Sequence, residues 1–323
     1  MTGGSQRLRH SIMTSLALAL AIPALAQAQS TKPAASTGAV ADLAAQSATL
    51  LGRVDPNGAR TTYHFQYGPT TRYGAATPPG VATASAGTIN VTGPLTGLAP
   101  ATTYHYRLVA TNRNGTTRGA DRTFKTRRQP LGLTLAATPN PVKLERPVLL
   151  AGTLTGTGNA NRRILLQSSP FPYTLGFQPT ANVQLTNAAG QFAFPLLAVA
   201  LNTQYRVLIP GRPEIASPIV SLGVAPRIAT YTSATRVRTN RRVRFFGTVR
   251  PAQPGARFAI QVLRRGAWRT VAGGVTRGSR SGVSRYAKTV RIRRGGRYRV
   301  YVAVASGSHV PSAGRTVRIS RIF

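Results

Sequence analysis

Three strand-like segments in the second half of the chain recur after nearly the same number of residues. Each is a short run in which apolar and polar residues alternate, as in a half-buried β-strand. The matched positions are Gly152 with Gly247, Gln167 with Gln261, and Tyr205 with Tyr298, at spacings of 95, 94 and 93 residues. A spacing that stays nearly constant over three separate segments predicts two copies of one domain.

The rest of the chain has the same pattern of short β-type runs separated by Gly, Pro and Asn. No long amphipathic helical pattern competes with these runs, so the chain is predicted to be all-β. We expect three tandem β-sandwich domains, at residues 42–127, 128–222 and 223–323. The chain has no cysteine, so each sandwich has to be held together by its hydrophobic core without disulfides.

The first residues have the features of an export signal. Arg7 and Arg9 precede an apolar stretch over residues 12–25, and Ala26-Gln27-Ala28 has the small residues of a cleavage site. We therefore predict a signal peptide at residues 1–28, followed by a Ser/Ala/Thr-rich linker at 29–41. We therefore expect a secreted or extracellular location, and non-covalent association with a cell wall is compatible with it.

Residues 97–107 form a bend followed by a strand of alternating aromatic and polar residues. Leu98, Pro100, Thr102 and Tyr104 make a Leu-x-Pro-x-Thr-x-Tyr pattern, and Phe-Gln-Tyr-Gly occurs at residues 65–68. Both patterns resemble bacterial fibronectin type III domains. The resemblance implies a tyrosine corner, in which Leu98 is buried and the Tyr104 hydroxyl is bonded to the backbone of the bend.

The second and third domains are similar to bacterial Ig-like repeats in architecture, without the Cys…Trp…Cys pattern of antibody domains. As a whole the chain resembles bacterial, in particular actinobacterial, secreted proteins with a fibronectin type III domain and two C-terminal Ig-like repeats. Such proteins hold or bind other molecules, and the resemblance implies a surface, adhesion or spacing role.

Charge is concentrated at the end of the chain. The sequence has 42 Lys and Arg against 5 Asp and Glu, and residues 223–323 contain 23 basic residues and no acidic one. In that domain the arginines alternate with apolar residues, which places the guanidinium groups on the outer faces of the strands. Guanidinium suits phosphate and carboxylate, so the domain is predicted to dock on an anionic cell-envelope polymer or polysaccharide.

The residues predicted to carry this contact are Arg236, Arg238, Arg244, Arg291, Arg293, Arg299 and Arg318. They are expected to act as a diffuse field and not as a pocket. The alternative is a solvated basic face that only keeps the protein soluble. Sequence-specific nucleic-acid binding is not expected, because no known DNA- or RNA-reading motif occurs.

The sequence does not predict an enzyme. The five carboxylates are not spaced as a catalytic pair, and no nucleophile, zinc or phosphate-loop motif occurs. No cofactor is expected. His64 and His105 are weak candidates for a surface metal site, because their strands would be neighbours in a fibronectin type III domain. The alternative is two solvated histidines.

Trp268, the only tryptophan, lies in a presumed hairpin and is a possible stacking residue for a sugar or a base. Phe177 holds a similar place in the repeat, and Tyr73 in the first domain is a further candidate. An aromatic residue that recurs at one place also suits a structural role, capping the sandwich. Two other functions therefore stay open: a carbohydrate-binding accessory module that uses Trp268, and a passive structural spacer without a ligand.

Overall fold

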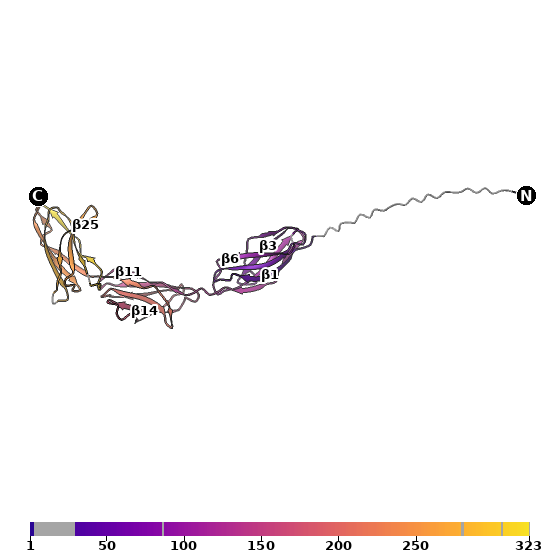
Figure 1. The fold of residues 1–323 in the computed structure, drawn as a ribbon, viewed down its shortest axis with the longest axis horizontal. Helices are drawn as coiled ribbons and strands as arrows, with labels where there is room; N and C mark the ends of the chain where they lie inside the picture. The colour runs from indigo at the N-terminus through magenta and orange to yellow at the C-terminus, as the bar shows by residue number, and fades with distance from the viewer. Residues whose placement is uncertain (3–29, 86, 279–280, 305, 323) are drawn as a thin grey trace. The chain divides into compact units, whose positions relative to one another are not determined.

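The protein is described by a computed structural model over residues 1–2, 30–85, 87–278, 281–304 and 306–322. These residues form strands, turns and irregular segments, and no helix occurs among them (Figure 1). Consequently the described part contains no helix of the length and apolarity that a membrane crossing requires. The predicted signal peptide lies almost wholly outside the described residues.

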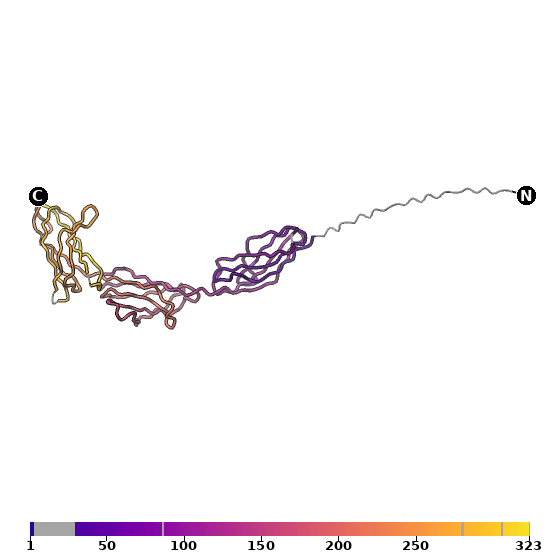
Figure 2. Tube along the Cα trace, in the orientation of Figure 1, coloured from indigo at the N-terminus to yellow at the C-terminus, as the bar shows by residue number. Residues whose placement is uncertain are grey.

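The all-β fold is confirmed: the chain forms three β-sandwiches in series, and Figure 2 traces its path through each. Contacts divide it into two compact units, residues 1–127 and 128–323. The first unit contains one sandwich. Its strands are β1 (Ala34–Ala41), β2 (Ala48–Asp55), β3 (Thr61–Gly68), β4 (Ala75–Ala76), β5 (Gly80–Ala82), β6 (Ile89–Leu95), β7 (Thr103–Asn112), β8 (Gly115–Arg118) and β9 (Arg122–Lys125).

These strands make two facing sheets. One has the order β1-β2-β6, and the other the order β4-β3-β7-β8, with β5 and β9 on β3 and β7. Alternation along the strands directs Leu50, Phe65 and Leu108 into a dry core between the sheets. At the bend before β7, the Ala99 N–H donates a hydrogen bond of 2.9 Å to the Tyr104 hydroxyl, and Leu98 is buried. This is the geometry of a tyrosine corner.

The segment predicted as a linker, residues 29–41, is not one throughout. Its second half is the edge strand β1, antiparallel to β2. The hydroxyl of Tyr106 donates to the Gly38 carbonyl at 2.8 Å, and the Leu108 N–H donates to Thr37 Oγ1. The small residues look like a linker by composition, but a partner strand supplies the hydrogen bonds that they need to form a strand.

The second unit contains two further sandwiches with the same arrangement. The strands of the second sandwich are β10 (Gly132–Leu133), β11 (Ala136–Thr138), β12 (Val142–Lys143), β13 (Val148–Thr155), β14 (Arg163–Pro170), β15 (Gln178–Leu185), β16 (Gln191–Leu196), β17 (Thr203–Ile209), β18 (Arg212–Ala216) and β19 (Val220–Leu222). Its sheets are β10-β13-β11 with β16, and β15-β14-β17-β18 with β19.

The strands of the last sandwich are β20 (Val224–Ala225), β21 (Arg227–Thr232), β22 (Arg236–Val237), β23 (Arg242–Arg250), β24 (Arg257–Arg264), β25 (Ala267–Val275), β26 (Arg277–Gly278), β27 (Ser284–Arg291), β28 (Gly296–Ala303), β29 (Ser312–Ala313) and β30 (Val317–Arg321). Strands β21-β23-β27-β26 form one sheet and β22-β30-β28-β24-β25 the other, with β29 on β28. Each of these two sandwiches has its own buried core.

The repeated glycine of the sequence has a steric reason. Gly152 lies on β13 and Gly247 on β23, each at the centre of its sheet. A Cβ at Gly152 would lie 2.1 Å from the Thr134 carbonyl oxygen, and one at Gly247 would lie 1.8 Å from that of Ala229. The backbone of the neighbouring segment approaches the strand so closely that only glycine fits.

The second and last sandwiches are joined by direct contacts within their unit. Strand β12 pairs in parallel with β20. Asn202 donates from its side chain to the Gly307 carbonyl, and Glu145 forms ion pairs of 3.1 and 3.2 Å with Arg227 and Arg250. His309 is 3% exposed in this region, and its Nε2 has no hydrogen-bond partner among the described residues.

The tyrosine corner is predicted to stabilise the first sandwich measurably. In a fragment of residues 30–127, Tyr104→Phe removes the bond from Ala99 and keeps the ring stacked on Phe124. We expect a loss of about 1 kcal/mol in the free energy of unfolding in urea. Tyr67→Phe is the matched control, because the Tyr67 hydroxyl has no bond to the described residues. Equal losses in the two variants would contradict the assignment.

Acidification is predicted to destabilise the second unit through His309. Burial lowers the pKa of His309, against a smaller opposite effect of the nearby Ala200 backbone. A lowered pKa means that the unfolded chain binds a proton before the folded one does. Stability is therefore full above the ordinary histidine pKa and falls as the pH drops below it. Thermal unfolding of residues 128–323, whose only histidine is His309, is expected at lower temperature at pH 5 than at pH 7. The variant His309→Gln is expected to lose this difference in unfolding temperature between pH 5 and pH 7. If the difference persists in the variant, His309 is not its cause.

Candidate polyanion interface

The same three-residue arrangement occurs on the outer face of all three sandwiches. A glutamine on one strand accepts a hydrogen bond from the Nε of an arginine directly opposite on the next strand, and an aromatic ring covers the guanidinium. The arginine–glutamine pairs are Arg107 with Gln66 (2.9 Å), Arg206 with Gln167 (2.7 Å) and Arg299 with Gln261 (2.9 Å). The covering rings are Tyr73 at 4.4 Å, Phe177 at 4.4 Å and Trp268 at 4.2 Å from the guanidinium carbon.

This arrangement decides how two predicted site residues are used. Arg299 is half-buried between Gln261 and Trp268, so its guanidinium is held by the protein itself, whereas the other six predicted arginines are exposed. Trp268 is also half-buried, and one face of its ring is covered by Arg299. The recurring aromatic residue therefore covers an arginine on the sheet surface, which leaves less of Trp268 available to a sugar or a base.

His64 and His105, the weak candidates for a surface metal site, do not lie side by side. His64 lies opposite Val109 and His105 opposite Gly68, four positions further along the two strands, or roughly 13 Å. The strands are neighbours as expected, but the register separates the two side chains. Instead, His105 Nδ1 lies 2.8 Å from Asp121, and no group of three or more possible metal ligands occurs in the described part of the chain.

Asp121 is shared by two side chains. Its carboxylate accepts hydrogen bonds of 2.8 Å from the Tyr73 hydroxyl and, at its other oxygen, from the His105 ring. Burial raises the pKa of Asp121, but the hydrogen bonds from His105 and Tyr73 together lower it by more than burial raises it. The carboxyl therefore ionises below its usual range. The site fixes the ring that covers Arg107 and has no second carboxylate for acid–base chemistry.

The seven predicted arginines do not form one patch. Arg236, Arg299 and Arg318 belong to the sheet that contains β28. Arg244 and Arg291 are exposed on the opposite sheet. Arg238 and Arg293 follow β22 and β27 in exposed connecting segments. The outward orientation expected from alternation is present, and it distributes the charge over both faces.

Several arginines of the last sandwich lie directly opposite one another on neighbouring strands. The like-charged pairs are Arg242 with Arg291, Arg277 with Arg285, and Arg297 with Arg318. Each such pair is unfavourable by up to about 1 kcal/mol in the absence of an anion. Arg227 and Arg250 of this sandwich form ion pairs with Glu145 of the preceding one. Because residues 223–323 contain no Asp or Glu, like-charged pairs such as Arg242 with Arg291 are available to an external anion.

One group of arginines surrounds a groove, which we call the arginine groove. It lies where the edge strand β25 of one sheet faces β27 of the other, and its volume is about 710 Å³. The arginines that line it are Arg264, Arg269, Arg291, Arg293 and Arg294. Its floor is formed by apolar residues such as Val262 and Val290 and by Tyr298. All of these arginines except Arg264 are exposed.

The loop that carries Arg293 and Arg294 is held in place from below. Arg264 donates to the carbonyls of Leu263, Arg294 and Gly295 at 3.1 to 3.3 Å, and the Tyr298 hydroxyl donates to the Arg294 carbonyl at 3.0 Å. Burial raises the pKa of Tyr298, against the opposing effect of Arg264, so the phenol keeps its proton. One arginine therefore positions the loop, and the others are left for a ligand.

Comparison with known proteins returns only distant structural likenesses. No protein-family model and no curated protein matches the chain. Solved structures that resemble it include titin domains A168–A170 (13% identity, 91% of this chain and 100% of that one, TM-score 0.37) and chicken CNTN1 FN1–FN3 domains (14%, 89% and 99%, 0.29). A tetra-tandem repeat from the extending region of a large adhesion protein also matches (15%, 89% and 74%, 0.27). At these values the likeness concerns the fold alone.

Sequence reasoning missed both the arginine groove and the Gln–Arg–aromatic arrangement. Tyr-Arg followed by Leu or Val occurs at residues 106–108, 205–207 and 298–300. This triplet recurs in all three domains and was a signal for the second feature. The groove had a weaker signal, the run Arg291-Ile292-Arg293-Arg294-Gly295-Gly296, in which a Cβ at Gly296 would lie 2.5 Å from Arg264.

Removal of the guanidinium from Trp268 is predicted to be visible in fluorescence. Arg299→Ala exposes the ring of the only tryptophan, so its emission is expected to move to longer wavelength. The variant also loses the bond to Gln261, with a cost of about 1 kcal/mol in unfolding free energy. Arg297→Ala, which removes an exposed arginine from the same strand, is expected to leave the emission unchanged. A shift in the control alone would refute the assignment.

Proposed function

We propose that this chain is an exported, non-catalytic adhesion or spacing protein whose last sandwich docks on an anionic polymer through the arginine groove. The observation that carries the proposal is the gathering of five arginines around one groove, with a loop positioned by Arg264. Planar guanidinium groups on a prearranged loop bind phosphate or carboxylate in a bidentate way at a low entropic cost. The ligand class is therefore a phosphate- or carboxylate-bearing envelope polymer.

The remaining sandwiches fit a spacing role. Each has an independent core, and the five carboxylates of the chain are dispersed and do not face one another in pairs in the described structure. Asp121 positions Tyr73, and Glu145 pairs with Arg227 and Arg250. This use of the carboxylates supports a protein without acid–base catalysis. Export remains part of the proposal and rests on the sequence of residues 1–28.

Two other functions were open from the sequence. A carbohydrate-binding module that depends on Trp268 is disfavoured, because Arg299 covers one face of that ring. A passive spacer is favoured by the distribution of the seven predicted arginines over both sheets. The arginine groove favours docking over the passive spacer, because its arginines come from separate segments of the chain and line the same groove.

The docking proposal predicts a strong and local dependence on charge. Binding of the full chain to poly(glycerol phosphate) and to polygalacturonate is measured across a salt series. The triple variant Arg269→Ser, Arg293→Ser, Arg294→Ser is expected to bind more weakly by at least about tenfold at low salt. The slope of log K against log salt is expected to fall by about 2 to 3, because each arginine that pairs with a phosphate releases roughly one counterion.

The matched control carries the same loss of charge elsewhere. Arg257→Ser, Arg297→Ser, Arg318→Ser removes three exposed arginines of β24, β28 and β30 that do not line the groove. If this control weakens binding as much as the groove variant, the charge acts as a diffuse field and the groove has no special role. If the unmodified chain binds neither polymer at low salt, the passive spacer is the correct interpretation.

A further inference from the structure

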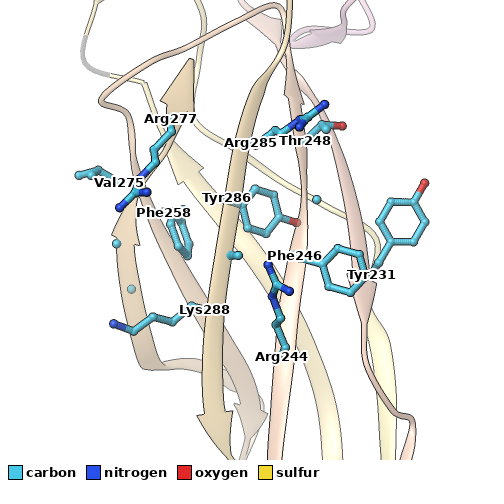
Figure 3. Close-up of a pocket in the computed structure, with 14 residues that line it drawn as sticks. Tyr231, Arg244, Phe246, Thr248, Phe258, Val275, Arg277, Arg285, Tyr286 and Lys288 are labelled. Atoms are coloured by element: carbon cyan, nitrogen blue, oxygen red, sulfur yellow. The ribbon is translucent and has the colours of Figure 1, made fainter. Parts of the chain in front are cut away.

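The outer face of the sheet β21-β23-β27 carries two exposed aromatic rings that the core does not use. Tyr231 is 58% exposed and Phe246 is 38% exposed. The two residues lie directly opposite each other on β21 and β23, with ring centroids 5.8 Å apart and planes inclined by 29°. Figure 3 shows the rings side by side, with Arg244 next to Phe246. We call this pair the aromatic platform.

The small residues around the platform keep it open. Ala287 on β27 lies directly opposite Phe246, and Gly247 follows Phe246 along β23. Both line the hollow of about 590 Å³ that includes the two rings. The exposed ring of Tyr231 is therefore open to a planar group from solvent, while access to Phe246 is shared with the Arg244 guanidinium. The cross-strand pair contributes to the stability of the sheet, and its exposed ring surface is also available to a ligand.

Cations lie on both sides of the platform along the strands. Arg285 is one side-chain row away in one direction and Arg244 one row away in the other, with the Arg244 guanidinium 5.6 Å from the centre of the Phe246 ring. The like-charged pair Arg242 and Arg291 is one row beyond Arg244. Arg291 also lines the arginine groove, so the two surfaces are continuous. The distance from the platform to Arg291 is roughly 13 Å along the strand.

This combination matches one class of polymer. Single-stranded nucleic acid presents a planar base and a phosphate in every unit, and proteins bind it without sequence preference through aromatic rings and a basic track. An acidic polysaccharide also satisfies the arginines, but its saturated ring contacts an aromatic face through C–H groups alone, whereas a base stacks on it with a π-face. We propose that the aromatic platform stacks bases of single-stranded nucleic acid while Arg244, Arg242 and Arg291 contact its phosphates. This inference goes beyond the proposed function, whose ligand is an envelope polymer, and shares with it only the basic surface around Arg291.

The test compares two probes with equal backbone charge. Binding of the full chain is measured by fluorescence anisotropy for labelled oligothymidylate and for an abasic deoxyribose-phosphate oligomer of the same length. The unmodified chain is expected to bind the oligothymidylate at least about fivefold more tightly, the effect of one stacked base. The variant Tyr231→Ser, Phe246→Ser removes this preference and leaves affinity for the abasic oligomer unchanged. Tyr301→Ser, on the other sheet, is the matched control and is expected to keep the preference.

Each other outcome overturns the inference. Equal affinity of the unmodified chain for the two oligomers means that only the backbone is bound and that the platform stacks nothing. If the platform variant loses binding to polygalacturonate and keeps its preference for oligothymidylate, the platform belongs to a polysaccharide. The groove variant Arg269→Ser, Arg293→Ser, Arg294→Ser separates the two proposals: it weakens binding of both oligomers if the docking function holds, whether or not bases are stacked. A preference that survives in the platform variant also refutes the assignment.

Discussion

The alternation of side chains along a β-strand is the constraint on which the rest of this structure depends. Every strand has to present its apolar residues to the core, since the chain has no disulfide to replace a weak core. In the last sandwich the other half of the positions is filled largely by arginine. A guanidinium is too costly to bury without a partner, so the two-residue period directs it to the solvent. Lys288 shows the exception, because it points inward by its period but escapes to solvent at the open side beside β25.

The Gln–Arg–aromatic arrangement shows how an arginine on a sheet surface is turned into a structural residue. Arg107, Arg206 and Arg299 each combine a bond to a glutamine across the ladder with a ring above the guanidinium. The ring differs in each sandwich (tyrosine, phenylalanine, tryptophan), while the arginine and the glutamine stay the same. Because the cation attracts any aromatic face, the ring type is free to vary. The same feature therefore occurs in the first sandwich and in the two repeats.

Part of the charge that is not used in this way lies at the open side of the last sandwich, around the arginine groove. Strands β25 and β27 are edge strands where they face each other, and arginine along such edges also hinders pairing with another chain. Repulsion between opposite arginines, such as Arg242 and Arg291, makes this region favourable for an anion. The arginine groove and the aromatic platform follow from one geometry: an exposed sheet face that continues around the edge of β27 into a basic hollow.

The sequence by itself determined the fold class, the repeat and the outward direction of the arginines, because each depends on local pattern. The two-residue period predicts which side of a strand is buried. The pattern from Leu98 to Tyr104 indicated the hydrogen bond between the Tyr104 hydroxyl and the backbone of the bend. Register decided the rest. It separated His64 from His105, although their strands are neighbours, and it turned residues 34–41 into a strand by supplying a partner. Which arginines converge, and which one is held beneath a ring, depends on contacts between segments far apart in the chain, and no local pattern contains them.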